Sequence, residues 1–300
     1  MAIVGKRTWS QMLFDWFNTA LMAFIIVIIL YPVLNMLAIS LSSDSAVLTS
    51  SVTFYPRGID FDAYRQVFQN HVLFTAYGNT IFIAVISCVL SLVFTSFAAY
   101  PLAFADFDGK KVISFMIVFT MWFSGGMIPS FLVIRYLGLI NSLWSLIFSS
   151  LIGAYHVVIL RNFFESIPDS LIESAHLDGA HDFCVLFRIV WPLSKPALAL
   201  IALWVVVGHW NDFFAPLLYL NDFHKYTLQL VLRDIVLNAT GMELYGMNTA
   251  YTTVESSSYA AISEQTKNAV VFVSMIPMLM LYPFLQKYFV KGIMLGAVKG

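Results

Sequence analysis

Hydrophobic positions along the chain gather in long runs that polar segments separate. The runs are continuous and do not alternate, which favours helices over the strands of a membrane barrel. A helix needs about 20 apolar residues to cross the hydrocarbon core of a bilayer, so the pattern predicts about six transmembrane helices. We place them near Trp16–Ile39, Asn79–Phe104, Val112–Ile134, Leu143–Phe163, Ala197–Leu220 and Ala269–Phe289.

Composition supports an all-α membrane protein with one transmembrane domain over residues 1–300. The 300 residues are 60% hydrophobic and only 11% charged, whereas a soluble domain carries roughly 25% charged residues. The first run is too long for the core of a signal peptide, so we expect a retained anchor helix. The net charge of −1 indicates no bulk attraction to nucleic acid. Cys88 and Cys184 are too far apart in sequence to indicate a disulfide framework.

The distribution of Lys and Arg predicts the orientation. Six spans put both termini on the same side as Lys110, Lys111, Arg161, Arg188 and Lys195. Short loops on the cytoplasmic side are enriched in these residues, so we expect both termini in the cytoplasm. The polar segments 40–71 and 221–267 then lie outside, and the segment 164–196 lies inside.

The inner polar segment reads as two short helices joined by a glycine. Pro168 suits a helix entrance, and Ser170 with Glu173 has the spacing of a capping box. Gly179 is expected to end the first helix in the left-handed conformation. The expected apolar face of that helix consists of Leu171, Ile172, Ala175 and Leu177.

A second helix is expected to begin at Asp182 and to end at Pro192 and Pro196, because proline interrupts a helix. Its expected apolar positions are Phe183, Leu186, Phe187 and Ile189. From these residues alone, the element is either a plain connector between two spans or a functional surface. The role of Glu173 is similarly open between a cap and a contact to a partner.

The segment resembles the EAA motif of permease subunits of ABC importers. That motif reads Glu-Ala-Ala, three residues, Gly, nine residues, Ile, two residues, Pro. Glu173-Ser-Ala175, Gly179, Ile189 and Pro192 match every spacing, with Ser174 in place of the middle alanine. Trp210-Asn-Asp-Phe213 resembles the end of the fifth helix in the sugar-importer branch of this family. The tail Gln286–Gly292 resembles the smaller permease of the maltose importer, and more closely permeases for complex or uronic-acid oligosaccharides.

The resemblance implies the type I ABC importer fold in a bacterial inner membrane. It implies a path for a sugar or oligosaccharide, with a lean toward acidic ones such as alginate or pectin fragments. The implied partners are a second homologous permease, two ATPase subunits and an external or periplasmic sugar-binding protein. The implied ATPase-coupling residues are Glu173, Ser174, Ala175, Asp178, Gly179, Ala180, Ile189 and Pro192.

The chain itself lacks a phosphate-binding loop. Gly5-Lys6 and Gly109-Lys110 have neither the spacing nor the hydroxyl residue of that motif. We therefore expect a transporter subunit without catalytic residues, metal or cofactor, with ATP and Mg²⁺ on partner ATPase subunits. A secondary transporter or another polytopic membrane protein without an ATPase is the alternative.

Polar and aromatic residues within the spans are candidates for the substrate path. We select Asn79, Trp122, Trp210, Asn211, Asp212 and Tyr219. Further candidates are Tyr100, Tyr155, His156, Trp204 and His209. Most aromatic residues at such positions serve packing or the interfacial belt, so we expect few of them to touch sugar. Ser124–Pro129 is expected to break the third span, either as a kink or as the hinge of a gate.

Overall fold

The computed structural model describes residues 9–237 and 264–281, and every regular element in these ranges is helical. The α-helices are α1 (Trp9–Ser40), α2 (Asp44–Leu48), α3 (Asp62–Gln69), α4 (His71–Phe104), α5 (Lys110–Trp122), α6 (Met127–Tyr136), α7 (Leu143–Ser149), α8 (Ala154–Phe164), α9 (Asp169–Leu177), α10 (Asp182–Val185), α11 (Trp191–Leu193), α12 (Lys195–Asn211), α13 (Phe214–Tyr219) and α14 (Leu228–Leu237). A π-helical turn covers Leu186–Val190, a 3₁₀ turn covers Phe223–Lys225, and a last helix covers residues 264–281. The predicted all-α class is confirmed.

Two helices, α1 and α4, are by themselves long and apolar enough to cross a membrane. Three bent helix pairs raise the number of candidate spans in the described ranges to as many as five. The sixth predicted span, 269–289, begins within the helix over residues 264–281, and its remainder lies outside the described residues. The matched tail from Gln286 onward also lies outside them.

The predicted break at Ser124–Pro129 is present and sharp. α5 and α6 are bent by 114° at this point. Gly126 adopts a φ of 86°, a left-handed conformation that side chains disfavour. The predicted span 112–134 is therefore two helices that change direction, and a straight crossing is excluded.

Two further spans that we expected to be continuous are interrupted. The span predicted at 143–163 bends by 51° between α7 and α8, which are separated by the break before Ala154. The span predicted at 197–220 ends at Asn211, because the Asp212 carboxylate accepts the backbone N–H groups of Phe214 and Ala215 and so starts α13. The N-cap of α13 is Phe213, and the Asp212 carboxylate just before it accepts two of the free N–H groups of the first turn.

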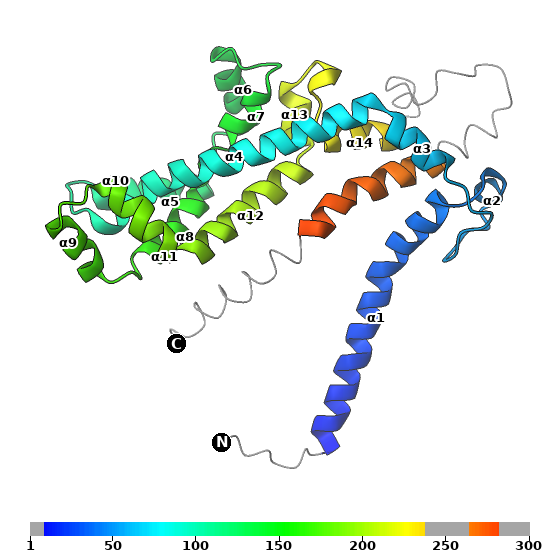
Figure 1. Cartoon of the computed structure of the whole chain (residues 1–300), viewed down its shortest axis with the longest axis horizontal. Coiled ribbons are helices and arrows are strands. Elements are labelled where there is room, and N and C mark those ends of the chain that lie inside the picture. The colour runs from blue at the N-terminus through cyan, green and yellow to red at the C-terminus, as the bar shows by residue number, and fades with distance from the viewer. Residues whose placement is uncertain (1–8, 238–263, 282–300) are drawn as a thin grey trace. The chain divides into compact units, whose positions relative to one another are not determined.

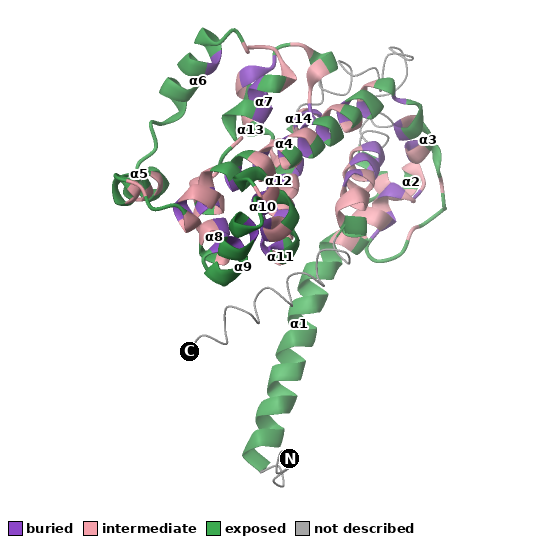
Figure 2. Cartoon of the chain, turned by 60° about the vertical axis from the view of Figure 1, so that its left-hand side comes forward, coloured by how far each residue is buried: buried purple, intermediate pink, exposed green. Residues whose placement is uncertain are grey.

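The described residues form two compact units. One contains the chain up to Asn70 with residues 235–237 and 264–275. Within it, α1 is exposed along nearly its whole length, with Ala38 and Ser40 as its buried residues (Figure 2). The Ser40 hydroxyl lies 2.8 Å from the Tyr64 hydroxyl, and the Gln265 side chain donates to the Ser42 carbonyl. These contacts tie the end of α1 to α3 and to the last helix.

The second unit, residues 71–234 with 276–281, is built around α4. Helices α8 and α12 both pack along α4 (Figure 1). The buried side of α4 is lined by small residues, which let helix backbones approach closely where lipid gives no hydrophobic drive. These residues are Ala76, Thr80, Ala84, Ser87, Ser91, Thr95, Ser96 and Ala99.

One buried cluster fixes the segment between α8 and α12 (residues 165–194, hereafter the α8–α12 loop) to the spans. Leu102 from α4, Phe164 from α8 and Ile201 from α12 belong to this cluster together with loop residues Ile172 and Val190. The loop therefore sits on the ends of three helices (Figure 1). Burial of this kind makes the loop a rigid extension of the spans.

Candidate functional site

Helix α9 begins differently from the sequence prediction. Its N-cap is Pro168, with an extended backbone at φ −60° and ψ 128°, and no side chain caps it. Ser170 lies within the first turn, so the predicted capping box of Ser170 and Glu173 is wrong. The fixed φ of proline lets helical geometry start immediately at Asp169. The Asp169 carboxylate then lies in the first turn, where the helix dipole favours negative charge.

The buried face of α9 is narrower than the sequence predicted. Ile172 and Ala175 are 6% and 8% exposed and belong to the cluster under the loop. Leu171 and Leu177, which we placed on the same face, are 44% and 89% exposed. Positions three apart share one face of a helix, and nine residues offer room for little more. The outward surface of α9 therefore combines exposed leucines with charged residues.

Gly179 ends α9 as predicted. It follows the C-cap Asp178 and adopts a φ of 83°. Its N–H donates to the His176 carbonyl at 3.0 Å, and the Ala180 N–H donates to the Ala175 carbonyl at 2.9 Å. These two bonds form a Schellman motif. A Cβ at Gly179 would meet no atom within 4 Å, so the requirement for glycine comes from the backbone angle alone.

The second half of the loop is one helical stretch, Asp182–Leu193, with the π turn at its centre. Val185, Leu186 and Val190 form its buried face, whereas Phe183 is 67% exposed, contrary to our prediction. Pro192 is the second-last residue of the stretch, which ends between Pro192 and Pro196 as predicted. The helix ends at Leu193, and the chain bends by 86° into α12. Because proline donates no N–H, the wider π turn before it accommodates the lost bond.

The predicted coupling residues divide into exposed and inward positions. Glu173, Ser174, Asp178, Gly179 and Pro192 are exposed. Ala175 is buried, and Ala180 and Ile189 are half-buried against the cluster. The structure thus gives the motif two kinds of residue, one facing outward and one that holds the loop in place.

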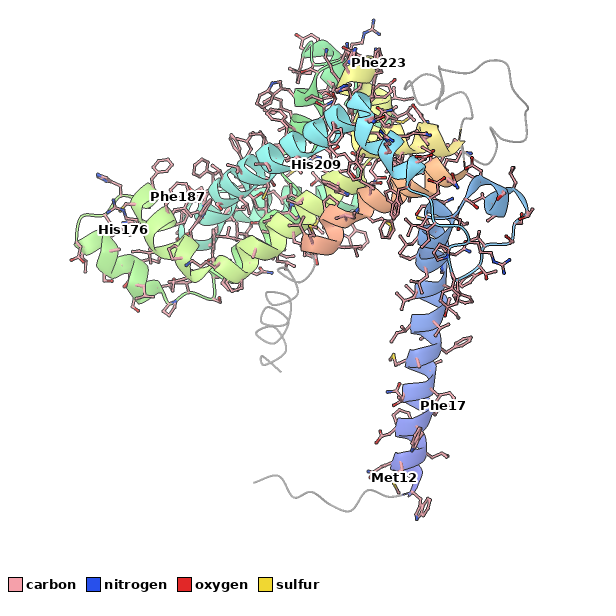
Figure 3. All side chains as sticks on the ribbon, turned by 45° about the vertical axis from the view of Figure 1, so that its right-hand side comes forward. Met12, Phe17, His176, Phe187, His209 and Phe223 are labelled. Carbon is pink, nitrogen blue, oxygen red and sulfur yellow. The ribbon has the colours of Figure 1, made fainter. Side chains whose placement is uncertain are left out.

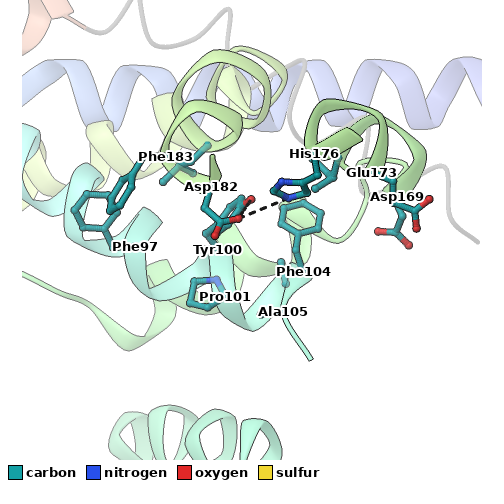
Figure 4. A pocket seen from close by; sticks show the side chains of 13 residues that line it. Phe97, Tyr100, Pro101, Phe104, Ala105, Asp169, Glu173, His176, Asp182 and Phe183 are labelled. Carbon is teal, nitrogen blue, oxygen red and sulfur yellow. Dashed lines mark hydrogen bonds and ion pairs between the residues drawn. The ribbon is translucent and has the colours of Figure 1, made fainter. Parts of the chain in front are cut away.

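A cavity of about 790 Å³ lies between the end of α4 and the loop (Figure 4). Its lining residues are Phe97, Tyr100, Pro101, Ala103, Phe104, Ala105, Asp169, Ile172, Glu173, His176, Asp182, Phe183 and Leu186. Within it, the Tyr100 hydroxyl donates to the Asp182 carboxylate at 3.2 Å. His176 Nε2 lies 3.6 Å from the same carboxylate oxygen. One wall is therefore aromatic and the other acidic.

The exposed surface of the loop, including the part that lines the open cavity beside α4, is rich in carboxylates. Asp169, Glu173 and Asp178 are exposed, and no hydrogen bond or ion pair joins them to another side chain in the described residues. Arg161, the nearest basic residue before the loop, is already paired with Glu165 at 2.8 Å. This surface therefore presents negative charge and exposed leucine to a partner.

The predicted path residues in the spans mostly have structural partners. The Asn79 amide donates to the carbonyls of His224 and Tyr226, and the Asp212 carboxylate accepts the N–H groups of Phe214 and Ala215. Trp210 is 4% exposed beside Tyr77, and Tyr219 is 5% exposed and stacked on Phe131.

The two remaining path residues are more open. The Asn211 amide donates to the carbonyl of Val207, one turn earlier, and its side chain is exposed. Trp122 is 81% exposed at the end of α5. The six selected residues come from α4, α5, α12, α13 and the connection between α12 and α13.

The structure does bring together four candidates that we had not selected. Tyr155 and His156 of α8 lie beside Trp204 of α12, with ring centroids 5.3 and 5.8 Å from the indole. One turn further along α12, His209 Nε2 lies 3.1 Å from the Ser150 hydroxyl (His209 in Figure 3). Their separation of about fifty residues in sequence hides this arrangement, and only the pairing of α8 with α12 reveals it.

The fold and the loop define an inner-membrane permease. Residues 90–295 match the family of binding-protein-dependent transport system inner membrane components, and the chain belongs to this family. The chain is 40% identical to the polygalacturonan/rhamnogalacturonan transport system permease protein YtcP of Bacillus subtilis, over 96% of this chain and 99% of that protein. It is 38% identical to protein LplC of the same organism, over 98% and 97% of the two chains.

A solved structure extends this likeness to three dimensions. The crystal structure of a bacterial ABC transporter involved in the import of the acidic polysaccharide alginate contains a chain that matches with a TM-score of 0.85. The identity is 34%, over 95% of this chain and 100% of the other. The type I importer fold and the resemblance to carbohydrate permeases of ABC importers are thereby confirmed. The alternative of a transporter without an ATPase is not favoured.

Proposed function

We propose that this chain forms, with a second homologous permease, the membrane path of an ABC importer for acidic oligosaccharides. The α8–α12 loop receives the movement of an ATPase subunit and passes it to the spans. The observation that carries this proposal is the attachment of the loop. Its EAA-spaced residues are exposed on one side and buried on the other among residues of α4, α8 and α12.

Rigidity of the loop supports the coupling role. Ile172, Val185 and Val190 are buried within one cluster with Phe164 and Ile201 of the spans. A push on α9 therefore displaces the ends of these spans as a body, whereas a flexible loop would absorb it. The Schellman motif at Gly179 fixes the angle between the two halves of the loop.

The outward surface supports a basic, partly apolar partner site. Glu173 and Asp178 supply charge, and Leu177 supplies exposed apolar area beside them. A single leucine that becomes fully buried contributes about 1.5–3 kcal/mol. We assign the partner as an ATPase subunit that carries the ATP and Mg²⁺, with a second copy on the other permease.

The orientation follows from the same loop. Lys110, Arg161, Arg188 and Lys195 all lie in or beside the connections at this end of α4, α8 and α12. The enrichment of short cytoplasmic loops in such residues supports placing the loop, and with it both termini, in the cytoplasm. The opposite side then faces a sugar-binding protein. The segment 221–267, which we expect to meet that protein, lies largely outside the described residues.

The substrate class is inferred from the relatives. YtcP is described as a permease for polygalacturonan and rhamnogalacturonan, and the solved transporter as an importer of alginate. Polymers of this type carry uronic acids, so we assign acidic oligosaccharides to this chain.

Co-purification from cells that express the neighbouring transport genes tests the proposal. Wild type is expected to bring down an ATPase and a second permease. Glu173→Ala with Gly179→Pro is expected to lose the ATPase. The matched control is Asp108→Ala with Gly138→Pro, which removes an exposed carboxylate and a left-handed glycine whose N–H also donates to the third residue before it. Equal ATPase recovery from both double variants would contradict the coupling role.

A further inference from the structure

Five residues from two neighbouring spans combine aromatic rings with hydrogen-bonding groups. Trp204 is at its centre, with Tyr155 and His156 beside it and the Ser150–His209 pair one turn away. We call these five residues the Trp204 platform. All belong to the same compact unit and lie on α8, on α12 or at the break between α7 and α8.

The platform lies at the depth of the membrane interior. Trp204 follows the first residue of α12, Lys195, by nine positions, which corresponds to about 14 Å of helix. The hydrocarbon core is about 30 Å thick, so a helix that starts at one boundary places Trp204 near its middle. His209 follows Lys195 by about 21 Å of helix, so it and its partner Ser150 lie further across the same core. Histidines and a serine inside the core are costly against lipid, and polar groups there normally face protein or a water-filled path.

The face of α12 that carries Trp204 also carries exposed residues. Trp204, Gly208 and Asn211 follow each other at spacings of four and three, which places them on one face of the helix. Gly208 and Asn211 are exposed, and a Cβ at Gly208 would meet no atom within 4 Å. Within the described residues, the space around Gly208, one turn from Trp204, is therefore unfilled.

The ring nitrogens of His156 make no hydrogen bond within the described residues. Its Nδ1 is buried without a partner in the described residues, and its ring is nearly parallel to the indole at an angle of 17°. A Cβ at Gly153 would come within 2.9 Å of this nitrogen, so the break before α8 makes room for the ring. The other ring nitrogen makes no hydrogen bond within the described residues.

We propose that the Trp204 platform is a sugar-binding site in the membrane path. The indole packs against the C–H face of a sugar ring, and the histidines and Ser150 bind its hydroxyls. The proposal rests on the proposed function, since it assigns the contact surface for the imported sugar. Ligand sites typically combine aromatic walls with a few polar groups in this way. Weak binding at an open site also suits transport, because a transported ligand must be bound weakly enough to leave.

The test uses the whole transporter, with both permeases, the ATPases and the binding protein, in proteoliposomes. The variants are Trp204→Leu, Trp204→Phe and Gly208→Leu. Leucine at 208 adds bulk on the same face of α12 as Trp204, and its Cβ would meet no atom of the described residues within 4 Å. Gly78→Leu is the matched control, because Gly78 is also an exposed helical glycine with nothing within 4 Å of its Cβ. Uptake of a labelled uronic-acid oligosaccharide and ATP hydrolysis are measured together.

We expect Trp204→Leu and Gly208→Leu to lower uptake about tenfold, the size of effect that ~1.4 kcal/mol of lost contact gives. ATP hydrolysis and assembly should stay near the wild-type level, Trp204→Phe should recover much of the uptake, and Gly78→Leu should behave as wild type. Unchanged uptake in Trp204→Leu and Gly208→Leu would overturn the proposal. Loss of the second permease from either variant would overturn it too, because the platform would then be a subunit interface. Failure of the wild type to take up sugar would instead contradict the proposed function itself.

Discussion

The Tyr100 hydroxyl donates a 3.2 Å hydrogen bond to the Asp182 carboxylate, which joins the last turns of α4 to the second half of the α8–α12 loop. The two residues are 82 positions apart in sequence. His176 of α9 approaches the same carboxylate at 3.6 Å (Figure 4). Asp182, in the second half of the loop, therefore lies close both to the span α4 and to the first half of the loop.

Tyr100→Phe is predicted to reduce the coupling of ATP hydrolysis to uptake. The change removes one hydrogen bond to a charged group, which contributes about 1.5–3 kcal/mol when buried and less here because Asp182 is exposed. We expect fewer sugars imported per ATP hydrolysed, with assembly intact. Tyr136→Phe is the control, because Tyr136 is 91% exposed. Equal transport-to-hydrolysis ratios in both variants would show that the bond plays no part in coupling.

Gly179→Ala is predicted to weaken ATPase binding through the backbone. A residue with a Cβ costs about 1–2 kcal/mol in the left-handed conformation. Gly138→Ala introduces the same strain at a φ of 70°, also with open space around the new methyl group. Both variants should lose similar thermal stability in detergent, but only Gly179→Ala should bind less ATPase. Equal binding in the two variants would refute the role of this angle.

Glu173→Gln is predicted to weaken ATPase binding most at low salt. The Glu173 carboxylate is exposed, so its attraction to a basic partner is screened as ionic strength rises. The measurement is ATPase affinity at two salt concentrations. Asp108→Asn, which also removes an exposed carboxylate, should change neither value. The prediction fails if Glu173→Gln and wild type show the same salt dependence.

Ile172→Ala is predicted to lower stability, whereas Leu177→Ala is predicted to weaken ATPase binding. Ile172 is 6% exposed, so truncation leaves a cavity and costs about 2–5 kcal/mol. Leu177 is 89% exposed, so its truncation should leave the thermal midpoint unchanged and weaken ATPase binding. Thermal unfolding and co-purification of both variants separate the two roles. A large stability loss in Leu177→Ala would contradict the exposed position.

Asp44→Asn is predicted to stabilise the chain in a pH-dependent way. Burial, with repulsion from Asp60 and Asp62, raises the pKa of Asp44 above its ordinary value. The folded state therefore holds the proton more tightly than the unfolded state, and the charged form opposes folding at neutral pH. The thermal midpoint of Asp44→Asn should exceed wild type at pH 7, and the gain should shrink as the pH falls toward 4. A gain that is constant with pH would contradict this cause.

The sequence predicted the spans better than their interruptions. Continuous apolar runs locate α4 and α12 because the bilayer demands length and hydrophobicity. The break near Gly126 was visible as a glycine pair followed by Pro129. The breaks before Ala154 and at Asp212 carry weaker local signals, since a single glycine or aspartate occurs at many positions where a helix continues.

In the α8–α12 loop too, local sequence signals could be predicted and features that depend on the packing of distant helices could not. Gly179 could be placed as a helix end because its requirement is local. Which apolar residues of α9 are buried could not be read from the sequence, because the ends of α4, α8 and α12 decide which face is covered. The gathering of His156 and Trp204 depends on the same packing of distant helices.

The most direct test of the coupling role is a photo-crosslinking amino acid placed at position 177 in the assembled transporter. The side chain there is exposed at the end of α9, and position 136, also exposed, serves as the control. We expect position 177 to form a covalent adduct with the ATPase subunit and position 136 to form none. No ATPase adduct from position 177, or equal adducts from both positions, would contradict the assignment of the α8–α12 loop as the coupling element.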